Sequence, residues 1–361
     1  MPTSRARFPR ARLRRVLVTG LVIAATTTTV FVSPARALLT KVTADWPSST
    51  LTTGSPAKVT GRVTGLEVGD GVFLQQKVLG GWDNVARADV ENDGDYKVRV
   101  PTWWTGERTY RVATTSLLDS TLLGAKSADW NVKIKPAYKP AGRAGHHSYS
   151  LSVPTRWDPC TVIGYRVNKR QATKGWGRDV RGALRRISEG TGYRFVFRGR
   201  TGKFPQSDSN SWYPNDTQLV IAWAKPAQSS LLRKYPGAAG VGAALSSGGY
   251  YNGDGTSTYR IKKGMVVIDS RYKRKAGFGR GYTRGELLMH EVGHAMGLSH
   301  VGASKQIMYP YMTKRKARFG KGDLTGMQKR GAKLGCVVAA PPTASRGTGH
   351  THTASQLVVQ P

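Results

Sequence analysis

Residues 290–300 read His-Glu-Val-Gly-His-Ala-Met-Gly-Leu-Ser-His. Residues four apart share one face of a helix, so His290 and His294 can offer two imidazoles to one metal ion. Glu291 follows the first of these histidines and is turned aside from their line, where its carboxylate can reach a water molecule. The segment therefore predicts a helix that presents two metal ligands and one acid–base group.

The residues on either side of this pair fit the same interpretation. Thr283 and Glu286 have the spacing of a capping box, which predicts that a helix opens near Thr283. Gly297 tolerates the left-handed backbone that ends a helix, so the chain can turn back and bring His300 in as a third ligand. Three histidines leave one position open on zinc, as in catalytic sites. The alternative, three histidines satisfied within a core, leaves Glu291 without a role.

The pattern His-Glu-x-x-His-x-x-Gly-x-x-His over residues 290–300 resembles the signature of the metzincin metalloproteases. Met308, within Gln-Ile-Met-Tyr-Pro at 306–310, stands where that clan has its Met-turn, a methionine under the metal. The short distance from His300 to Met308 is most similar to the matrixin branch. A looser similarity covers residues 150–337. It implies an α+β domain in which helices pack on a twisted mixed sheet and a cleft crosses the zinc.

The resemblance implies a zinc-dependent endopeptidase that hydrolyses protein or peptide substrates. In this interpretation His290, His294 and His300 hold one catalytic Zn²⁺, and Glu291 is the general base for a zinc-activated water. Met308 forms the Met-turn.

Three features of the chain limit what can be carried over from the family. Residues 150–337 contain no further histidine, so no second, structural zinc is expected there. Tyr311 directly follows Pro310, whereas the family has Pro-x-Tyr in the wall of its specificity pocket. Ca²⁺ is an option at residues 252–255, Asn-Gly-Asp-Gly, but a plain hairpin turn fits the same residues.

The first 37 residues have the pattern of a secretory signal peptide. Six arginines precede a mostly apolar run over 16–32, and Ala-Arg-Ala at 35–37 has the form of a cleavage site. An uncleaved membrane anchor is the alternative, but the run is short and contains four threonines at 26–29. We expect a secreted, extracellular protein, either free or associated with the cell envelope, with no stable membrane span after cleavage. Arg14-Arg15 leaves the export route open between the general and the twin-arginine pathways.

The chain has only two cysteines, Cys160 and Cys336. In an exported protein they are most simply interpreted as one disulfide, which the chain-entropy model values at about 5 kcal/mol for so long a loop. Two free buried thiols are the alternative.

The rest of the chain divides by composition. Residues 38–135 carry short alternating runs separated by Gly and Asp turns, which predict a β-sandwich. This segment resembles the immunoglobulin-like modules of bacterial surface and secreted proteins, although it lacks the Cys…Trp…Cys signature. The Pro- and Gly-rich segment 136–149 predicts a linker between this module and the metalloprotease domain at 150–337. Residues 338–361 predict a disordered tail.

Charge is distributed unevenly along the chain, whose formal net charge is +35. Residues 38–130 have a balance of −1 and residues 131–361 a balance of +29. This excess favours an anionic cell-wall polymer or an acidic substrate as partner. It also supports an alternative function, a non-catalytic protein that binds the cell envelope or a polyanion. No specific nucleic-acid binding is expected, because the charge alone would give only salt-dependent, non-specific binding. A solubilising surface accounts for the same charge.

Overall fold

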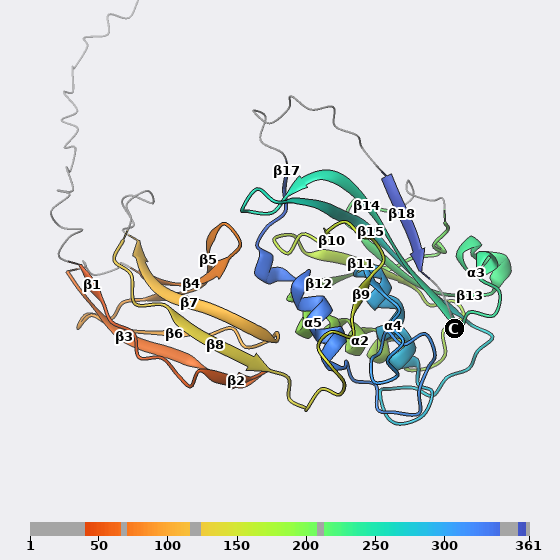
Figure 1. Ribbon diagram of the computed structural model, residues 1–361, viewed down its shortest axis with the longest axis horizontal. Coiled ribbons are helices and arrows are strands. Elements are labelled where there is room, and N and C mark those ends of the chain that lie inside the picture. The colour runs from red at the N-terminus through yellow and green to blue at the C-terminus, as the bar shows by residue number, and fades with distance from the viewer. Residues whose placement is uncertain (1–39, 66–70, 116–123, 208–212, 340–352, 359–361) are drawn as a thin grey trace, which may run out of the picture.

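The computed structural model describes residues 40–65, 71–115, 124–207, 213–339 and 353–358. The predicted signal peptide at 1–37 lies outside these ranges. Figure 1 shows an all-β part, residues 41–135, beside a larger part in which a long curved sheet lies over helices. No helix among the described residues has the length and apolar character that a membrane crossing requires.

Two sheets make up the all-β part. One has the strand order β1-β3-β6 and the other β2-β8-β7-β4-β5. Alternate side chains of these strands meet in a shared core that includes Val59, Leu74, Val98 and Val112. The immunoglobulin-like assignment of this part stays a prediction. Its strands are β1 (Lys41–Val42), β2 (Thr50–Thr52), β3 (Lys58–Thr64), β4 (Gly71–Val78), β5 (Gly81–Asp89), β6 (Asp95–Arg99), β7 (Gly106–Thr115) and β8 (Trp130–Lys135).

The larger part is a mixed sheet with helices on it, the α+β architecture that the sequence predicted. The order along the sheet is β12-β11-β13-β15-β14; the first four strands are parallel and β14 is antiparallel to β15. The strands of this sheet are β10 (Thr155–Arg156), β11 (Ile163–Asn168), β12 (Phe195–Arg200), β13 (Leu219–Ala224), β14 (Gly240–Tyr251), β15 (Ser257–Asp269), β17 (Val338–Ala339) and β18 (Thr353–Val358). The helices are α2 (Trp176–Thr191), α3 (Ser230–Lys234), α4 (Arg284–Ala295) and α5 (Lys321–Lys329), with short 3₁₀ turns η1 (Pro226–Gln228) and η2 (Ala332–Leu334).

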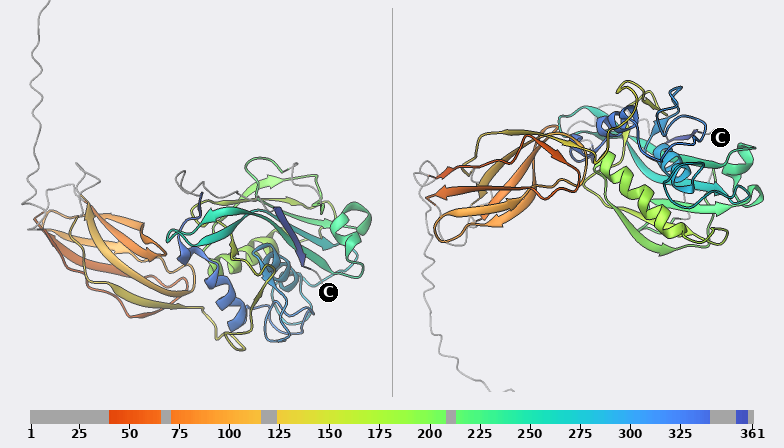
Figure 2. Two further views of the ribbon diagram at one scale, coloured as in Figure 1. Left: turned by 45° about the horizontal axis from the view of Figure 1, so that its top comes forward. Right: turned by 90° about the horizontal axis from the view of Figure 1, so that it is seen from below.

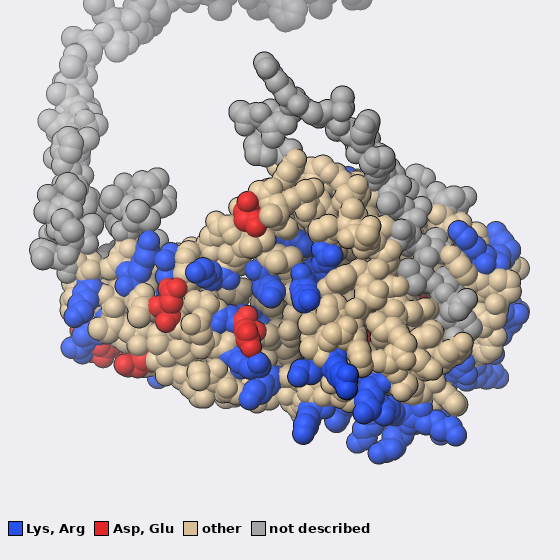
Figure 3. Space-filling model, in the orientation of Figure 1, with Lys and Arg blue, Asp and Glu red and all other residues tan. Residues whose placement is uncertain are grey.

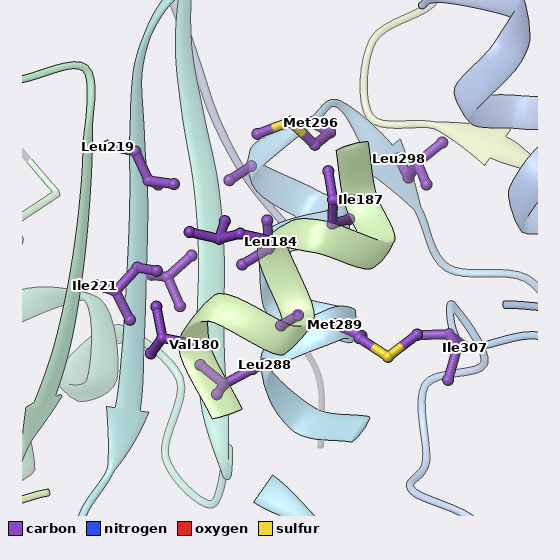
Figure 4. Close-up of a cluster of buried hydrophobic side chains, with 14 of the residues drawn as sticks. Val180, Leu184, Ile187, Leu219, Ile221, Leu288, Met289, Met296, Leu298 and Ile307 are labelled. Carbon is purple, nitrogen blue, oxygen red and sulfur yellow. The ribbon is translucent and has the colours of Figure 1, made fainter. Parts of the chain in front are cut away.

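Helices α2 and α4 lie on the same side of this sheet, as both views of Figure 2 show. Their apolar faces meet in one buried core (Figure 4), where Val180 and Leu184 of α2 lie close to Leu288 of α4 and Ile221 of β13. The spacing of four residues between Val180 and Leu184 places both on one face of α2. Burial of this face therefore sets the position of α4, the helix that carries the histidine motif.

A buried ion pair also joins the beginnings of α2 and α4. Arg284 Nη2 lies 2.6 Å from Asp179 Oδ2, and their side chains are only 3% and 0% exposed. Arg284 Nε donates to the same oxygen at 2.7 Å, and Gly277 N donates to Asp179 Oδ1 at 3.1 Å. Each charge has been removed from water, so each depends on the other for compensation.

We expect Arg284→Met to destabilise the protein by about 3–5 kcal/mol, because it leaves Asp179 buried without its counter-ion. Urea unfolding followed by far-ultraviolet circular dichroism measures this. The double variant Asp179→Leu/Arg284→Met should lose less than the sum of the two single variants. Strict additivity would contradict a direct coupling between these charges.

The segment expected to be a linker is packed against the larger part. Lys321 N donates to Ala141 O at 2.7 Å, and Tyr138 Oη donates to Phe319 O at 3.0 Å. Strand β9 (Ser148–Tyr149) pairs with β16 (Leu298–Ser299), directly after the histidine helix. Composition could not reveal these partners, which lie more than 140 residues away in the sequence.

The residues beyond 337 differ from the predicted disordered tail where the structure describes them. Strand β17 pairs with Tyr250 and Tyr251, and β18 pairs with Gly242–Ser247, both along β14. Without these two strands, the backbone N–H and C=O groups along the outer edge of β14 would lack strand partners. Such groups can form hydrogen bonds with an extended segment whatever its side chains. Composition alone does not report this kind of pairing.

The two cysteines form the expected disulfide, with Cα atoms 5.2 Å apart and a sequence separation of 176. Asp158 Oδ1 accepts from both Cys160 N and Val337 N, so the two chain segments are also joined by hydrogen bonds. Figure 3 shows Lys and Arg side chains gathered over the lower right of the drawn face, on the part that holds the mixed sheet, whereas most of the acidic side chains in view lie toward the left.

Candidate metal centre

Helix α4 positions two of the predicted ligands, His290 and His294. Its first turn is capped by Thr283, whose Oγ1 accepts from Glu286 N at 3.2 Å. The helix ends at Ala295, and Gly297 follows with φ 91°, the left-handed conformation that was predicted for it. The chain then turns back through β16 and delivers His300 to the same place.

The three histidines converge on one point. His290 Nε2 lies 3.0 Å from both His294 Nε2 and His300 Nε2, and the latter two atoms are 3.1 Å apart. Nitrogens bound to a tetrahedral zinc at about 2.0–2.1 Å are about 3.3 Å from one another. The three Nε2 atoms are thus a few tenths of an ångström closer together than in an ideal zinc site, and imidazole nitrogen is a donor that zinc binds.

The positions of the protons also indicate a cation. His290 Nδ1 lies 2.7 Å from Ile307 O, and His294 Nδ1 lies 2.9 Å from Leu298 O. A carbonyl oxygen only accepts, so each Nδ1 must carry the proton of its neutral ring. The two Nε2 atoms then face each other with bare lone pairs, which repel at 3.0 Å unless a cation lies between them.

Burial keeps these rings neutral. It lowers the pKa of His290 to about 4 and lowers the pKa of His294 well below its ordinary value, with the neighbouring His290 and His300 adding to the effect on His294. The pKa of His300 is also lowered by burial. At neutral pH all three imidazoles are therefore in the form that binds a metal.

Glu291 lies beside the histidines and is only 3% exposed. Burial raises the pKa of its carboxyl group to about 8, and a backbone hydrogen bond from Gly242 opposes this rise. Strand β14 passes very close to α4 here, since a Cβ on Gly242 would lie 1.9 Å from Glu291 O. Only glycine permits that approach. A dication held by the histidines would favour the ionised carboxylate.

Met308 lies under the histidine helix. It is buried, and a Cβ on Gly293 would lie 2.5 Å from Met308 Sδ, so this turn of α4 rests directly on the methionine. Val301 N donates to Met308 O at 3.0 Å, which connects this turn to the residue after His300.

Asp323, at the start of α5, is a functional residue that the sequence did not single out. Its Oδ2 accepts from Ile307 N at 2.7 Å and from Gly320 N at 2.8 Å, and its Oδ1 accepts from Met308 N at 3.2 Å. Ile307 O and Met308 N belong to one peptide unit, and Ile307 O accepts from His290, so Asp323 orients this candidate ligand through that unit. The available signal was an acidic residue at a position that the structure shows to be the first turn of α5. A capping role alone explains that pattern equally well.

The region that contains this geometry also resembles known proteins. Residues 198–330 match the matrixin family model. The match includes all of α4, His300, Met308 and Asp323, and it supports a matrixin-type domain with a zinc metallopeptidase-type function. No curated protein matches the chain.

The described residues fit the zinc that the matrixin match implies. His290, His294 and His300 form a group that could hold a metal ion, and imidazole nitrogens are donors that zinc takes in proteins. A second group consists of Asp158, Cys160 and Cys336. Its two sulfur atoms are bonded to each other in the disulfide, so they do not serve as thiolate ligands. The turn at 252–255 joins β14 to β15, and Asp254 Oδ1 accepts from Thr256 N and Oγ1. Calcium at this turn stays a prediction.

We expect Asp323→Asn to weaken zinc binding by roughly 10–100-fold, the usual cost of losing a group that orients a metal ligand. In the variant, an NH2 group that only donates would replace one of the carboxylate oxygens that accept from Ile307 N and Met308 N. The backbone at Ile307 would therefore shift. Competition with a chromophoric chelator measures the affinity. Thr325→Ala on the same helix is the matched control and should bind zinc normally. Unchanged affinity of Asp323→Asn would contradict the orienting role.

The lowered histidine pKa values also predict how zinc binding depends on pH. An ordinary imidazole begins to lose metal to protons below about pH 6.5. Because His290 has a pKa of about 4, affinity should change little between about pH 7.5 and 6 and should fall as the pH approaches 4. Chelator competition at a series of pH values measures this. A decline that begins at about pH 6.5 would contradict the buried, neutral state of the rings.

Proposed function

We propose that this chain is a secreted zinc-dependent endopeptidase. The observation that carries the proposal is the triangle of Nε2 atoms from His290, His294 and His300, placed beside a buried carboxylate. Zinc held there would polarise a peptide carbonyl and lower the pKa of a water to about 7. A structural zinc site would instead use four protein ligands, and the described residues bring only three ligands to this group.

Glu291 is proposed as the general base. Its position on α4, one residue after His290, places its carboxylate outside the line of ligands, where it can take a proton from the attacking water. The same carboxyl group then gives the proton to the amine that leaves. Burial raises the pKa of this carboxyl group to about 8, and a bound dication would lower that pKa and favour the ionised form that accepts a proton.

The location of the protein is part of the proposal. The arginine-rich start, apolar run and Ala-Arg-Ala at 35–37 support export with cleavage of the leader. The disulfide between Cys160 and Cys336 fits an oxidising compartment. Association with an anionic cell-wall polymer stays a prediction that rests on the charge of residues 131–361.

We expect Glu291→Gln to lower kcat for peptide hydrolysis by roughly 10²–10⁴-fold, the contribution of a positioned general base. Zinc content should stay at one ion per chain, because the variant keeps all three histidines. Casein and a quenched fluorescent peptide library provide the assay, and metal analysis provides the second readout. Glu91→Gln, on the exposed surface of the all-β part, is the matched control. Full activity in Glu291→Gln would exclude the assigned role, and absence of chelator-sensitive cleavage by the wild type would exclude the endopeptidase.

A further inference from the structure

Two loops beside α4 carry a concentration of positive charge. They are residues 271–281, which precede the helix, and residues 313–318, which follow Met308; we call them the basic loops. The first holds five Lys or Arg residues and the second holds four, and neither contains Asp or Glu. Figure 3 shows Lys and Arg side chains gathered over this region, below the position of α4 in Figure 1.

Backbone hydrogen bonds hold the basic loops side by side. Gly281 N donates to Lys314 O at 3.1 Å, and Ala317 N donates to Phe278 O at 3.1 Å. The apolar residues Phe278 and Ala317 anchor the two loops on the buried core. The positive charges of two segments that are separated in the sequence therefore belong to one surface.

The cations of this surface face solvent and are nearly free of acidic partners. Arg271 forms an ion pair with Asp269 at 2.7 Å, and among the described residues no acidic side chain pairs with any other exposed Lys or Arg of these loops. A surface that serves only solubility mixes both signs of charge. Here like charges repel one another, and an anionic ligand would relieve that repulsion. The exposed members are Arg271, Lys273, Lys275, Arg280, Lys314, Arg315, Lys316 and Arg318.

The basic loops border the candidate metal centre. One cavity is lined by His290 and Glu291 and also by Arg274, Tyr282 and Tyr311. Arg274 belongs to the first basic loop, Tyr282 directly follows that loop, and Tyr311 stands two positions before the second loop. If the proposed function is correct, a polypeptide that lies across the histidines and leaves on this side would pass over the basic loops.

This position favours carboxylates on the substrate chain itself as the anions that bind. An occupant held beside the point of cleavage is most simply a further part of the chain that is cleaved. Exposed cations attract anions over about 10 Å at 0.1 M salt, so an extended segment with several Asp or Glu residues needs no single fixed geometry. A neutral segment would gain nothing from this surface, and a basic segment would be repelled.

We propose that the basic loops bind an acidic segment of the protein substrate, outside the residues next to the scissile bond. The proposal rests on the endopeptidase function and names its substrate class. At low salt, kcat/KM for a peptide extended by a run of glutamates should exceed that for the matched glutamine peptide by roughly 10-fold. The gain should appear mainly as a lower KM, because the charges act on encounter and binding rather than on the chemical step. It should shrink toward about 1 M salt, where the screening length is about 3 Å.

The test uses the zinc-loaded full chain and one cleavable core peptide, extended on either side by a run of Glu, Gln or Lys. The triple variant Lys314→Gln/Arg315→Gln/Lys316→Gln should lose most of the preference for the Glu peptide. It should still cleave the Gln peptide at the wild-type rate, because none of these three residues lines the cavity at the metal centre. The variant Lys314→Glu/Arg315→Glu/Lys316→Glu should instead favour the Lys peptide. Local misfolding alone would not produce such an inversion.

The matched control is Lys58→Gln/Lys97→Gln/Arg99→Gln, which removes the same charge from the exposed surface of the all-β part. It should keep the wild-type preference, because only the charges beside the metal centre are expected to act. Equal kcat/KM for the Glu and Gln peptides in the wild type would overturn the proposal. A preference for the Glu peptide that survives the glutamine substitutions at 314–316 would also overturn it.

A binding assay separates this proposal from the protease assignment. Fluorescence anisotropy of the Glu and Gln peptides on zinc-loaded Glu291→Gln measures the surface without cleavage. Salt-dependent, tighter binding of the Glu peptide that is lost when the substitutions at 314–316 are added would support the surface even if no peptide is ever cleaved. Equal affinities would overturn it. Binding of inorganic polyphosphate without binding of the Glu peptide would indicate a phosphate polymer as the partner and would overturn it as well.

Discussion

The arrangement of three imidazole nitrogens about one point is the constraint on which the rest of this site depends. Because Ile307 O and Leu298 O accept from the Nδ1 atoms of His290 and His294, the Nε2 lone pairs are forced toward each other at 3.0 Å. Such an arrangement is unfavourable unless it is compensated by positive charge. The fold therefore favours a cation at this point. Burial keeps the imidazole rings neutral, which is the form that binds a cation.

The parts around the histidines serve mainly to hold this arrangement. Asp323 accepts from Met308 N and so holds the peptide unit whose Ile307 O accepts from His290. Met308 packs against Gly293, where a side chain would leave no room for it. The Asp179–Arg284 pair ties the beginning of α4 to α2. These groups come from separate segments of the chain, so the metal site is supported by packing and hydrogen bonds as well as by its own helix.

Local signals in the sequence predicted much of the backbone geometry around the histidines correctly. The spacing of His290 and His294, the cap at Thr283 and the left-handed Gly297 all involve residues within one or two helical turns. Glu286 shows where local reasoning stops. Its position in the first turn was explained by a capping box, yet its carboxylate accepts hydrogen bonds from Thr313 N and Oγ1. The cap preference is worth about 1 kcal/mol, which tertiary contacts readily outweigh.

By itself the sequence determined the three candidate ligands, the spacing of His290 and His294 on one helix face and the one carboxylate beside them, because helical geometry follows from neighbouring residues. Tertiary structure alone decided that Asp323 would hold the peptide unit that meets His290, that the Pro-rich segment would pack on α5, and that Glu286 would accept from Thr313. These contacts join residues far apart in the chain or turned away from their local partners. Their free energies depend on burial, which no local pattern specifies.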